Sequence, residues 1–324
     1  MAPFWIFLLG LLTVVGGAEL IVRGASVLAA RVGISPMVIG ATVVAIGTST
    51  PELAIAIEAA GRGSGALVLG NVAGSNTLNI LFILGLIALI RPVVLRSRVI
   101  RFDLPVLVGA ASLLLLLAAD GVVSRVDGIL LLALGLFYSF LVVRAARRES
   151  IAVRIQFARE FGVPRSAITS TGRVVRAAIW LIAGIAVVVV GADLLVDGAV
   201  SIARDLGAPE AVIGLTIVAI GTSAPELVTA VVAALRREQD LAVGNLIGSS
   251  IFNIVLILGI AALIPVDGVP VEPAVLWIDF AVMLGATIVC IPVFVTGTRI
   301  SRLEGAALVA AYLAYFSALL LTRL

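Results

Sequence analysis

A six-residue motif, Gly-Thr-Ser-x-Pro-Glu, occurs at residues 47–52 and again at 221–226, each time inside a long apolar stretch. Proline has no backbone N–H for the helix ladder, and its ring crowds the preceding turn. A carboxylate at the centre of a membrane helix is costly unless it has a partner or a function. The motif therefore predicts an interrupted membrane helix in each copy, and the repetition predicts that the two interruptions meet at one site.

The composition indicates that lipid is the solvent for most of the chain. Hydrophobic residues make up 62% of the sequence and charged residues 13%. A spanning helix needs roughly 20 apolar residues, so we predict an all-α membrane protein with ten transmembrane helices. The basic residues are all arginines between the apolar segments, a pattern that favours contact with the lipid bilayer over nucleic acid. The helices are expected at 3–31, 36–61, 66–90, 101–119, 126–146, 174–205, 210–235, 241–264, 273–295 and 301–322.

Several functional classes are excluded by residues that the sequence lacks. It has no histidine and a single cysteine, Cys290, so it cannot form an internal disulfide, a thiolate metal cluster or a zinc site of the usual kind. It has no lysine, and therefore no Gly-x-x-x-x-Gly-Lys nucleotide-binding loop. The acidic and zinc motifs of intramembrane hydrolases are also missing. We expect a transporter rather than an enzyme, with no cofactor.

The two halves of the sequence match each other at a fixed offset of 226 − 52 = 174 residues. Glu52 aligns with Glu226, and Asn79 aligns with Asn253. Five helices in each copy is an odd number, so the second copy must enter the membrane from the opposite side. We predict two inverted five-helix repeats: residues 1–146, containing the motif region 40–79, and residues 174–324, containing the motif region 214–253, joined by a basic cytoplasmic linker at 147–173.

The arginines predict the orientation of the chain. They concentrate in the connections at 91–101 and 144–176 and after residues 235 and 298, which alternation places on one face of the membrane. The positive-inside rule makes that face cytoplasmic. We therefore expect a multi-pass protein of the cell inner (plasma) membrane whose N- and C-termini are both extracytoplasmic.

The residues around each helix break offer only oxygen ligands. Proline frees carbonyl groups one turn earlier, and the motif adds two hydroxyls and a carboxylate. Hard cations prefer such a set, and Ca²⁺ takes about 6–8 oxygen ligands. The predicted metal ligands at the two breaks are Ala45, Thr48, Ser49 and Glu52, with Ala219, Thr222, Ser223 and Glu226.

A Gly-Asn-x-x-Gly-Ser element on the next helix of each repeat extends this site. Ser75 and Asn79 are four residues apart and share a helix face, and the same holds for Ser249 and Asn253. We assign both faces to the ion cavity, and we expect Asn71 and Asn245 to brace the broken backbone. The two glutamates provide two negative charges, which balance one divalent or two monovalent cations.

On these paired motifs the sequence resembles the cation/calcium exchanger superfamily, specifically its sodium/calcium exchanger branch. The resemblance implies ten helices with both ends outside, and two long helices, the first and the sixth, that slide over a core formed by the others. It implies that sodium influx drives calcium extrusion. The ligands that it implies are Thr48, Ser49, Glu52, Ser75, Asn79, Thr222, Ser223, Glu226, Ser249 and Asn253, with the carbonyls of Ala45 and Ala219.

The sequence thus predicts an antiporter that exchanges Ca²⁺ for Na⁺ by alternating access at a midplane site. The alternative is an antiporter of the same fold that exchanges Ca²⁺ or another cation for H⁺, with glutamates that cycle between protonated and ion-bound forms. Some exchangers of the branch have an aspartate at one of the positions occupied here by Asn79 and Asn253, so the counter-ion is left open between sodium and protons. The calcium/proton branch with Gly-Asn-x-x-Glu elements is a poorer match.

Overall fold

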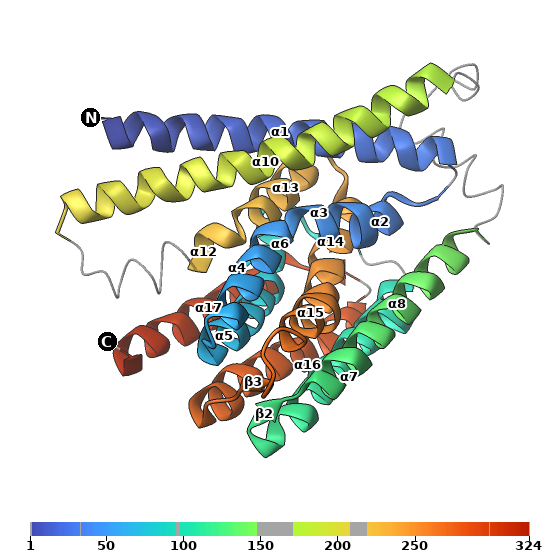
Figure 1. The fold of residues 1–324 in the computed structure, drawn as a ribbon. Helices are drawn as coiled ribbons and strands as arrows, with labels where there is room; N and C mark the ends of the chain where they lie inside the picture. Colours follow the sequence, from blue (N-terminus) through green and yellow to red (C-terminus); the bar gives the residue numbers. More distant parts are fainter. Residues whose placement is uncertain are drawn as a thin grey trace.

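A computed structural model describes residues 2–32, 34–94, 98–147, 171–207, 219–297 and 299–323. These residues are almost entirely helical (Figure 1). The predicted linker at 147–173 lies largely outside the described residues, as do residues 208–218, where the second motif region begins.

Two long helices, α1 (Ala2–Val32) and α10 (Thr171–Asp205), lie side by side and antiparallel across one face of the molecule (Figure 1). Glycines spaced seven residues apart form their contact: a Cβ on Gly10 would lie 2.4 Å from the backbone nitrogen of Leu195. The equivalent glycines of α10 meet the backbone of α1 in the same way. Small residues are what allow membrane helices to approach this closely. The glycines at the contact are Gly10, Gly17, Gly24, Gly184, Gly191 and Gly198.

Each copy of the Gly-Thr-Ser-x-Pro-Glu motif forms a broken helix, as predicted. In the first copy the chain bends by 45° between residues 36–48 and 50–61. Ser49 and Ser223 sit at the breaks, with φ and ψ of −83° and 14°, and of −90° and 11°. Both leave the helical region, and each proline then occupies the first turn of a new helix, where its missing N–H costs nothing. The elements are α2 (Pro36–Ile39), η1 (Gly40–Val44), α3 (Ala45–Thr48) and α4 (Thr50–Gly61), and in the second copy α12 (Ala219–Thr222) and α13 (Ala224–Leu235).

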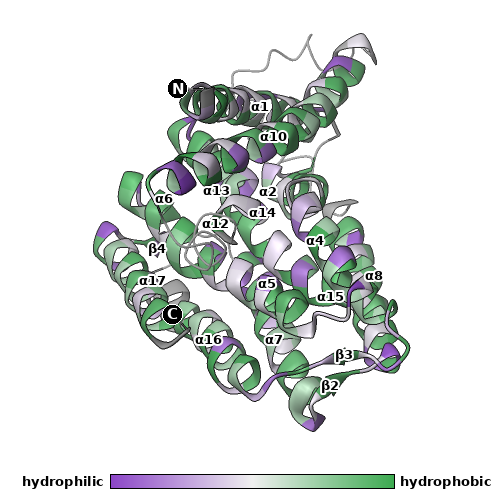
Figure 2. Ribbon diagram, turned by 60° about the vertical axis from the view of Figure 1, so that its left-hand side comes forward, coloured by the Kyte–Doolittle hydropathy of each residue, from purple (hydrophilic) through white to green (hydrophobic). Residues whose placement is uncertain are grey.

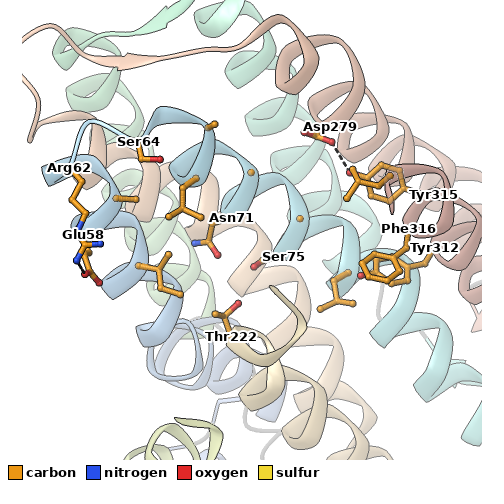
Figure 3. A pocket seen from close by; sticks show the side chains of 18 residues that line it. Glu58, Arg62, Ser64, Asn71, Ser75, Thr222, Asp279, Tyr312, Tyr315 and Phe316 are labelled. Carbon is orange, nitrogen blue, oxygen red and sulfur yellow. Dashed lines mark hydrogen bonds and ion pairs between the residues drawn. The ribbon is translucent and has the colours of Figure 1, made fainter. Parts of the chain in front are cut away.

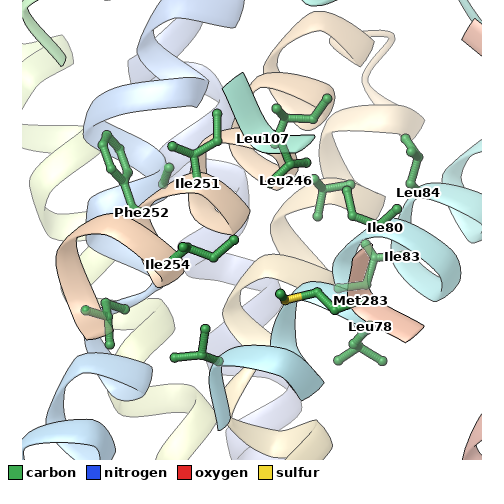
Figure 4. Close-up of a cluster of buried hydrophobic side chains, with 14 of the residues drawn as sticks. Leu78, Ile80, Ile83, Leu84, Leu107, Leu246, Ile251, Phe252, Ile254 and Met283 are labelled. Carbon is green, nitrogen blue, oxygen red and sulfur yellow. The ribbon is translucent and has the colours of Figure 1, made fainter. Parts of the chain in front are cut away.

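The helix that follows each break runs through the centre of the molecule. In the first half it comprises α5 (Gly65–Thr77), η2 (Leu78–Ile83) and α6 (Leu84–Ile90), and in the second half α14 (Gln239–Phe252), η7 (Asn253–Ile257) and α15 (Leu258–Ala262). A π-helical segment interrupts each one at its asparagine. Side chains of both halves, including Ile80, Leu246 and Phe252, pack into one hydrophobic core (Figure 4).

The remaining helices surround this centre. They are η3 (Val99–Asp103), α7 (Leu104–Leu117), η4 (Ala118–Asp120) and α8 (Arg125–Arg147) in the first half, and η8 (Val275–Asp279), α16 (Phe280–Gly297) and α17 (Arg302–Arg323) in the second. Two short antiparallel pairs join the halves: β1 (Val93–Val94) with β4 (Arg299–Ile300), and β2 (Val122–Val123) with β3 (Val269–Pro270).

By length and composition, seven helices of the described residues are able to cross a membrane, or eight if the bent pair at 36–61 counts as one span. Shorter apolar helices at Ala224–Leu235 and Val275–Ile291 fall below that length. Large apolar side chains such as Trp5, Leu116 and Phe137 are exposed, as expected for surfaces that face lipid. Hydrophobic residues dominate the ribbon in Figure 2. The fold is that of a helical membrane protein, and the total of ten spans stays a prediction.

The helix pair of α1 and α10 does not contact the two broken helices equally. Helix α1 packs along α13, whereas α10 makes no comparable contact with α4 within the described residues. An ion pair accompanies the first contact, since an Arg236 guanidinium nitrogen lies 2.6 Å from Glu19 Oε1. Glu19 also pairs with Arg23 on its own helix. These contacts give Glu19 a structural role, since they hold α1 against the end of α13.

Candidate metal centre

The two helix breaks face each other through a reciprocal pair of hydrogen bonds. Ser49 Oγ donates to Glu226 Oε1 at 2.9 Å, and Ser223 Oγ donates to Glu52 Oε1 at 2.9 Å. The same offset of 174 residues relates one bond to the other. All four side chains are buried, with at most 3% of any of them exposed. Each carboxylate is therefore held by the serine of the other break.

The serines of the central helices join this cluster. Ser249 Oγ lies 3.4 Å from both Glu226 Oε1 and the carbonyl oxygen of Ala45. On the other side, Ser223 Oγ and Ser75 Oγ are 3.2 Å apart. The structure thus gathers hydroxyl, carboxylate and carbonyl oxygens from both halves of the chain into one buried space.

Four oxygens of the predicted ligand set are buried and have no hydrogen-bond partner among the described residues. They are the second carboxylate oxygens of Glu52 and Glu226 and the side-chain oxygens of Asn79 and Asn253. Leaving a buried polar group unsatisfied costs about 1–3 kcal/mol, and more for a charged group. A bound cation would satisfy them, because such oxygens are the ligands that hard cations take.

One of the two asparagines is held by a residue to which the sequence assigned no role. Asn253 Nδ2 donates to Asn76 Oδ1 at 3.0 Å, and Asn76 Nδ2 donates to the carbonyl oxygen of Ser250 at 3.0 Å. The sequence did contain an indication of a role for Asn76. Asn76 and Ser250 are polar residues of the central helices, and they are equivalent under the 174-residue offset.

The remaining predicted residues are placed differently. Thr48 Oγ1 lies 3.1 Å from the carbonyl oxygen of Val44 and 3.2 Å from Asn245 Oδ1, so groups from both halves of the chain already engage it. Thr222 is half-buried, and Ala219 is the first residue of α12. The predicted bracing role of Asn71 is confirmed, because its Nδ2 donates to the backbone oxygen of Glu52 at 3.2 Å.

A cavity of about 540 Å³ lies beside the cluster, between α4, α5 and α17. Ser75 and Thr222 line it, and the exposed ion pair of Glu58 and Arg62 lies toward one end (Figure 3). Tyr315, whose hydroxyl donates to Asp279 Oδ1 at 2.9 Å, lines another wall. The cavity therefore extends from an exposed ion pair to two predicted ligands.

The described residues contain no group of three or more His, Cys, Asp or Glu side chains placed to hold a metal ion. The centre instead combines two carboxylates with neutral hydroxyl, amide and carbonyl oxygens. Such a set of ligands carries only two formal negative charges, and it is suited to a cation that is bound reversibly.

Known proteins match this chain in sequence and in fold. The sequence profile of the family described as sodium/calcium exchanger protein matches residues 2–144 and 176–321. The sodium/calcium exchanger MaX1 of Methanosarcina acetivorans is 33% identical over an alignment of 342 positions, gaps included, and this alignment covers 96% of this chain and 97% of MaX1. The inner membrane protein YrbG of Escherichia coli is 38% identical over 286 residues, which cover 88% of this chain and 86% of YrbG.

A solved structure of the sodium-calcium exchanger NCX_Mj, soaked with 2.5 mM Na⁺ and 0.1 mM Ca²⁺, superimposes with a TM-score of 0.84. The two chains are 31% identical, and the match covers 98% of this chain and 99% of NCX_Mj. Relatives of this kind are ion exchangers and not enzymes. The profile match extends over nearly the whole sequence, and the chain therefore belongs to the sodium/calcium exchanger protein family.

Proposed function

We propose that this protein is a secondary active antiporter that exchanges Ca²⁺ for Na⁺ by alternating access at the centre formed by Glu52 and Glu226. The observation that carries the proposal is the reciprocal pair of serine–glutamate hydrogen bonds beside four unpartnered buried oxygens. Family membership supports it, as do the sodium/calcium exchanger names of MaX1 and NCX_Mj.

The exchange follows from the charges at the centre. One Ca²⁺ neutralises the two carboxylates, and so do two Na⁺, whereas an empty centre leaves two anions buried without compensation. Because both ions need the same glutamates, Ca²⁺ and Na⁺ compete and cannot be bound together. The ligands of the proposed centre are Ala45, Thr48, Ser49, Glu52, Ser75, Asn79, Ala219, Thr222, Ser223, Glu226, Ser249 and Asn253.

The proposed architecture is two inverted repeats of five spans, at 1–146 and 174–324, joined by a cytoplasmic linker at 147–173. Both termini are extracytoplasmic, and the protein lies in the inner membrane. The offset of 174 residues that relates both the motifs and the serine–glutamate bonds supports the repeat. The printed name of YrbG supports the location. In this architecture α1 and α10 move together over the rest of the protein, which their glycine contacts support.

The proposal is tested by the uptake of radioactive Ca²⁺ into liposomes that contain the purified protein and are preloaded with Na⁺. The wild type should accumulate Ca²⁺ inside the liposomes, because Na⁺ leaving down its outward gradient drives Ca²⁺ uptake. Glu52→Gln and Glu226→Gln should each reduce uptake by roughly 100-fold or more, because each removes a charge that the ions require. Glu272→Gln, at an exposed position, is the matched control and should retain uptake. Normal uptake by both site variants would refute the proposal.

The counter-ion is tested separately, because a buried carboxylate oxygen without a partner is also satisfied by a proton. In the same liposomes, an uncoupler that collapses the proton gradient should leave Na⁺-driven uptake unchanged. Loss of uptake on collapse, together with uptake driven by an imposed pH gradient without Na⁺, would identify a cation/proton antiporter instead.

A further inference from the structure

We propose that Asn76 is a positioning residue that fixes the carboxamide of Asn253 with its oxygen toward the ion. The inference rests on the proposed function, because it assigns a role in holding the same cation. Asn76 itself is not among the ligands that the repeat motifs predict.

The orientation follows from a chain of two hydrogen bonds that begins at a backbone carbonyl. A carbonyl oxygen only accepts hydrogen bonds, so the oxygen of Ser250 requires the NH₂ group of Asn76, 3.0 Å away. The oxygen of Asn76 then faces the other way and requires the NH₂ group of Asn253, also 3.0 Å away. What is left is Asn253 Oδ1, which is buried and unpartnered.

Burial makes this orientation hard to reverse. Asn76 is fully buried, and Asn253 is 1% exposed. Rotating the Asn76 amide by half a turn would bring its oxygen against the oxygen of Ser250 and its NH₂ group against that of Asn253. Rotating the Asn253 amide alone would point two donors at the space that a cation occupies. Asn76 therefore selects the form of Asn253 that binds a cation.

The equivalent residues, Ser250 and Asn79, do not repeat this arrangement. The residue equivalent to Asn76 is Ser250, and its hydroxyl donates to the carbonyl oxygen of Leu246 at 2.8 Å. Asn79, the equivalent of Asn253, thus lacks a carboxamide partner at position 250. The two amide ligands are consequently inequivalent, although the motifs around them are nearly identical. Ser250 also provides the matched control, because only its backbone oxygen takes part in the chain of bonds.

The test is a double-mutant cycle on detergent-purified protein, read as the apparent dissociation constant for radioactive Ca²⁺ at equilibrium. Asn76→Leu should weaken Ca²⁺ binding by about tenfold, because residues that orient metal ligands typically contribute 10–100-fold to affinity. Ser250→Ala should bind like the wild type. In an Asn253→Ala background, where Asn76 has no amide oxygen to orient, Asn76→Leu should cause little further loss.

Unchanged Ca²⁺ affinity in Asn76→Leu would overturn the inference. So would a loss that repeats in full in the Asn253→Ala background, because that result means Asn76 only supports the packing. If Asn76→Leu does not give a monodisperse protein, Asn76→Ala takes its place in the same cycle. The proposed function itself fails in a distinguishable way, because the wild type would then bind no Ca²⁺.

Discussion

Glu52 and Glu226 each have one oxygen bonded to a serine and one oxygen without a partner. Two buried anions, each with an unsatisfied lone pair, destabilise the ion-free protein. An ion that binds removes this penalty, so ion binding and stability are linked. This linkage makes the roles of the two residues measurable without any transport assay.

Ca²⁺ at 100 times its dissociation constant should stabilise the wild type by about 2.7 kcal/mol, and should raise the apparent melting temperature by about 5 °C. Glu226→Gln should melt at a higher temperature than the ion-free wild type, because it removes one buried charge, and it should no longer respond to Ca²⁺. Thermal unfolding in detergent, followed by tryptophan fluorescence, measures both effects. Glu272→Gln should reproduce the wild-type shift, and a Glu226→Gln protein that still gains several degrees with Ca²⁺ would contradict this account.

The sequence predicted the identity of the clustered residues better than their partners. Repeated serines and glutamates in apolar stretches are conspicuous, because nothing else in such segments is polar. The sequence did not indicate that Ser49 would bond to Glu226 and not to Glu52, since that depends on how the two breaks cross. The bond between Asn76 and Asn253 was not predicted for the same reason, because it joins residues 177 positions apart.

At the scale of elements, apolar runs and proline positions gave the helix limits to within about three residues, as in the segment 66–90 compared with Gly65–Ile90. Of the expected helix at 210–235, the structure describes residues 219–235, so only this part of the prediction can be compared. The π-helical segments were not predicted, because no residue type marks a π-turn as proline marks a break. Two of them contain Asn79 and Asn253, in keeping with the frequent occurrence of π-turns at functional sites.

The contact between α1 and α10 gives a sharp prediction, because neighbouring glycines differ in their surroundings. A Cβ on Gly17 would lie 2.7 Å from Val188 Cγ2 and 2.8 Å from its backbone nitrogen, whereas a Cβ on Gly16 would meet nothing within 4 Å. Gly17→Ala should therefore separate the helices and cost about 1–3 kcal/mol. Gly16→Ala should be neutral or slightly stabilising. Melting temperatures of the two variants in detergent decide this, and equal values would contradict the packing described.

At the scale of the whole molecule, the two halves are alike in sequence but are not in the same arrangement. Helix α1 packs on α13 and is tied to it by Glu19 and Arg236, while the equivalent packing of α10 on α4 is missing from the described residues. In a transporter built from inverted repeats, the opposite-facing state arises when the halves exchange their arrangements. At the offset of 174 residues, the residue equivalent to Glu19 is Asp193, and the residue equivalent to Arg236 is Arg62.

We therefore expect a second ion pair, between Asp193 and Arg62, in the state opposite to the one described. Paired cysteines at 19 and 236 should react at once with a bifunctional thiol reagent, and paired cysteines at 62 and 193 should react only while ions are being exchanged. Either cross-link should stop Ca²⁺ uptake. Gel mobility and uptake in liposomes measure this, and a 62/193 pair that never reacts during turnover would contradict the expected exchange of arrangements.

The two ion pairs should differ in how readily they form. Arg62 already has a partner on its own helix, Glu58, at 2.5 Å, whereas the position equivalent to Glu58 in the second half is Val232. Arg62 must give up that local carboxylate before it reaches Asp193, but Arg236 faces no such competition from residue 232. The pair of Glu19 and Arg236 should therefore form more readily than the pair of Asp193 and Arg62, so we expect the protein at rest to favour the arrangement described here over the opposite one.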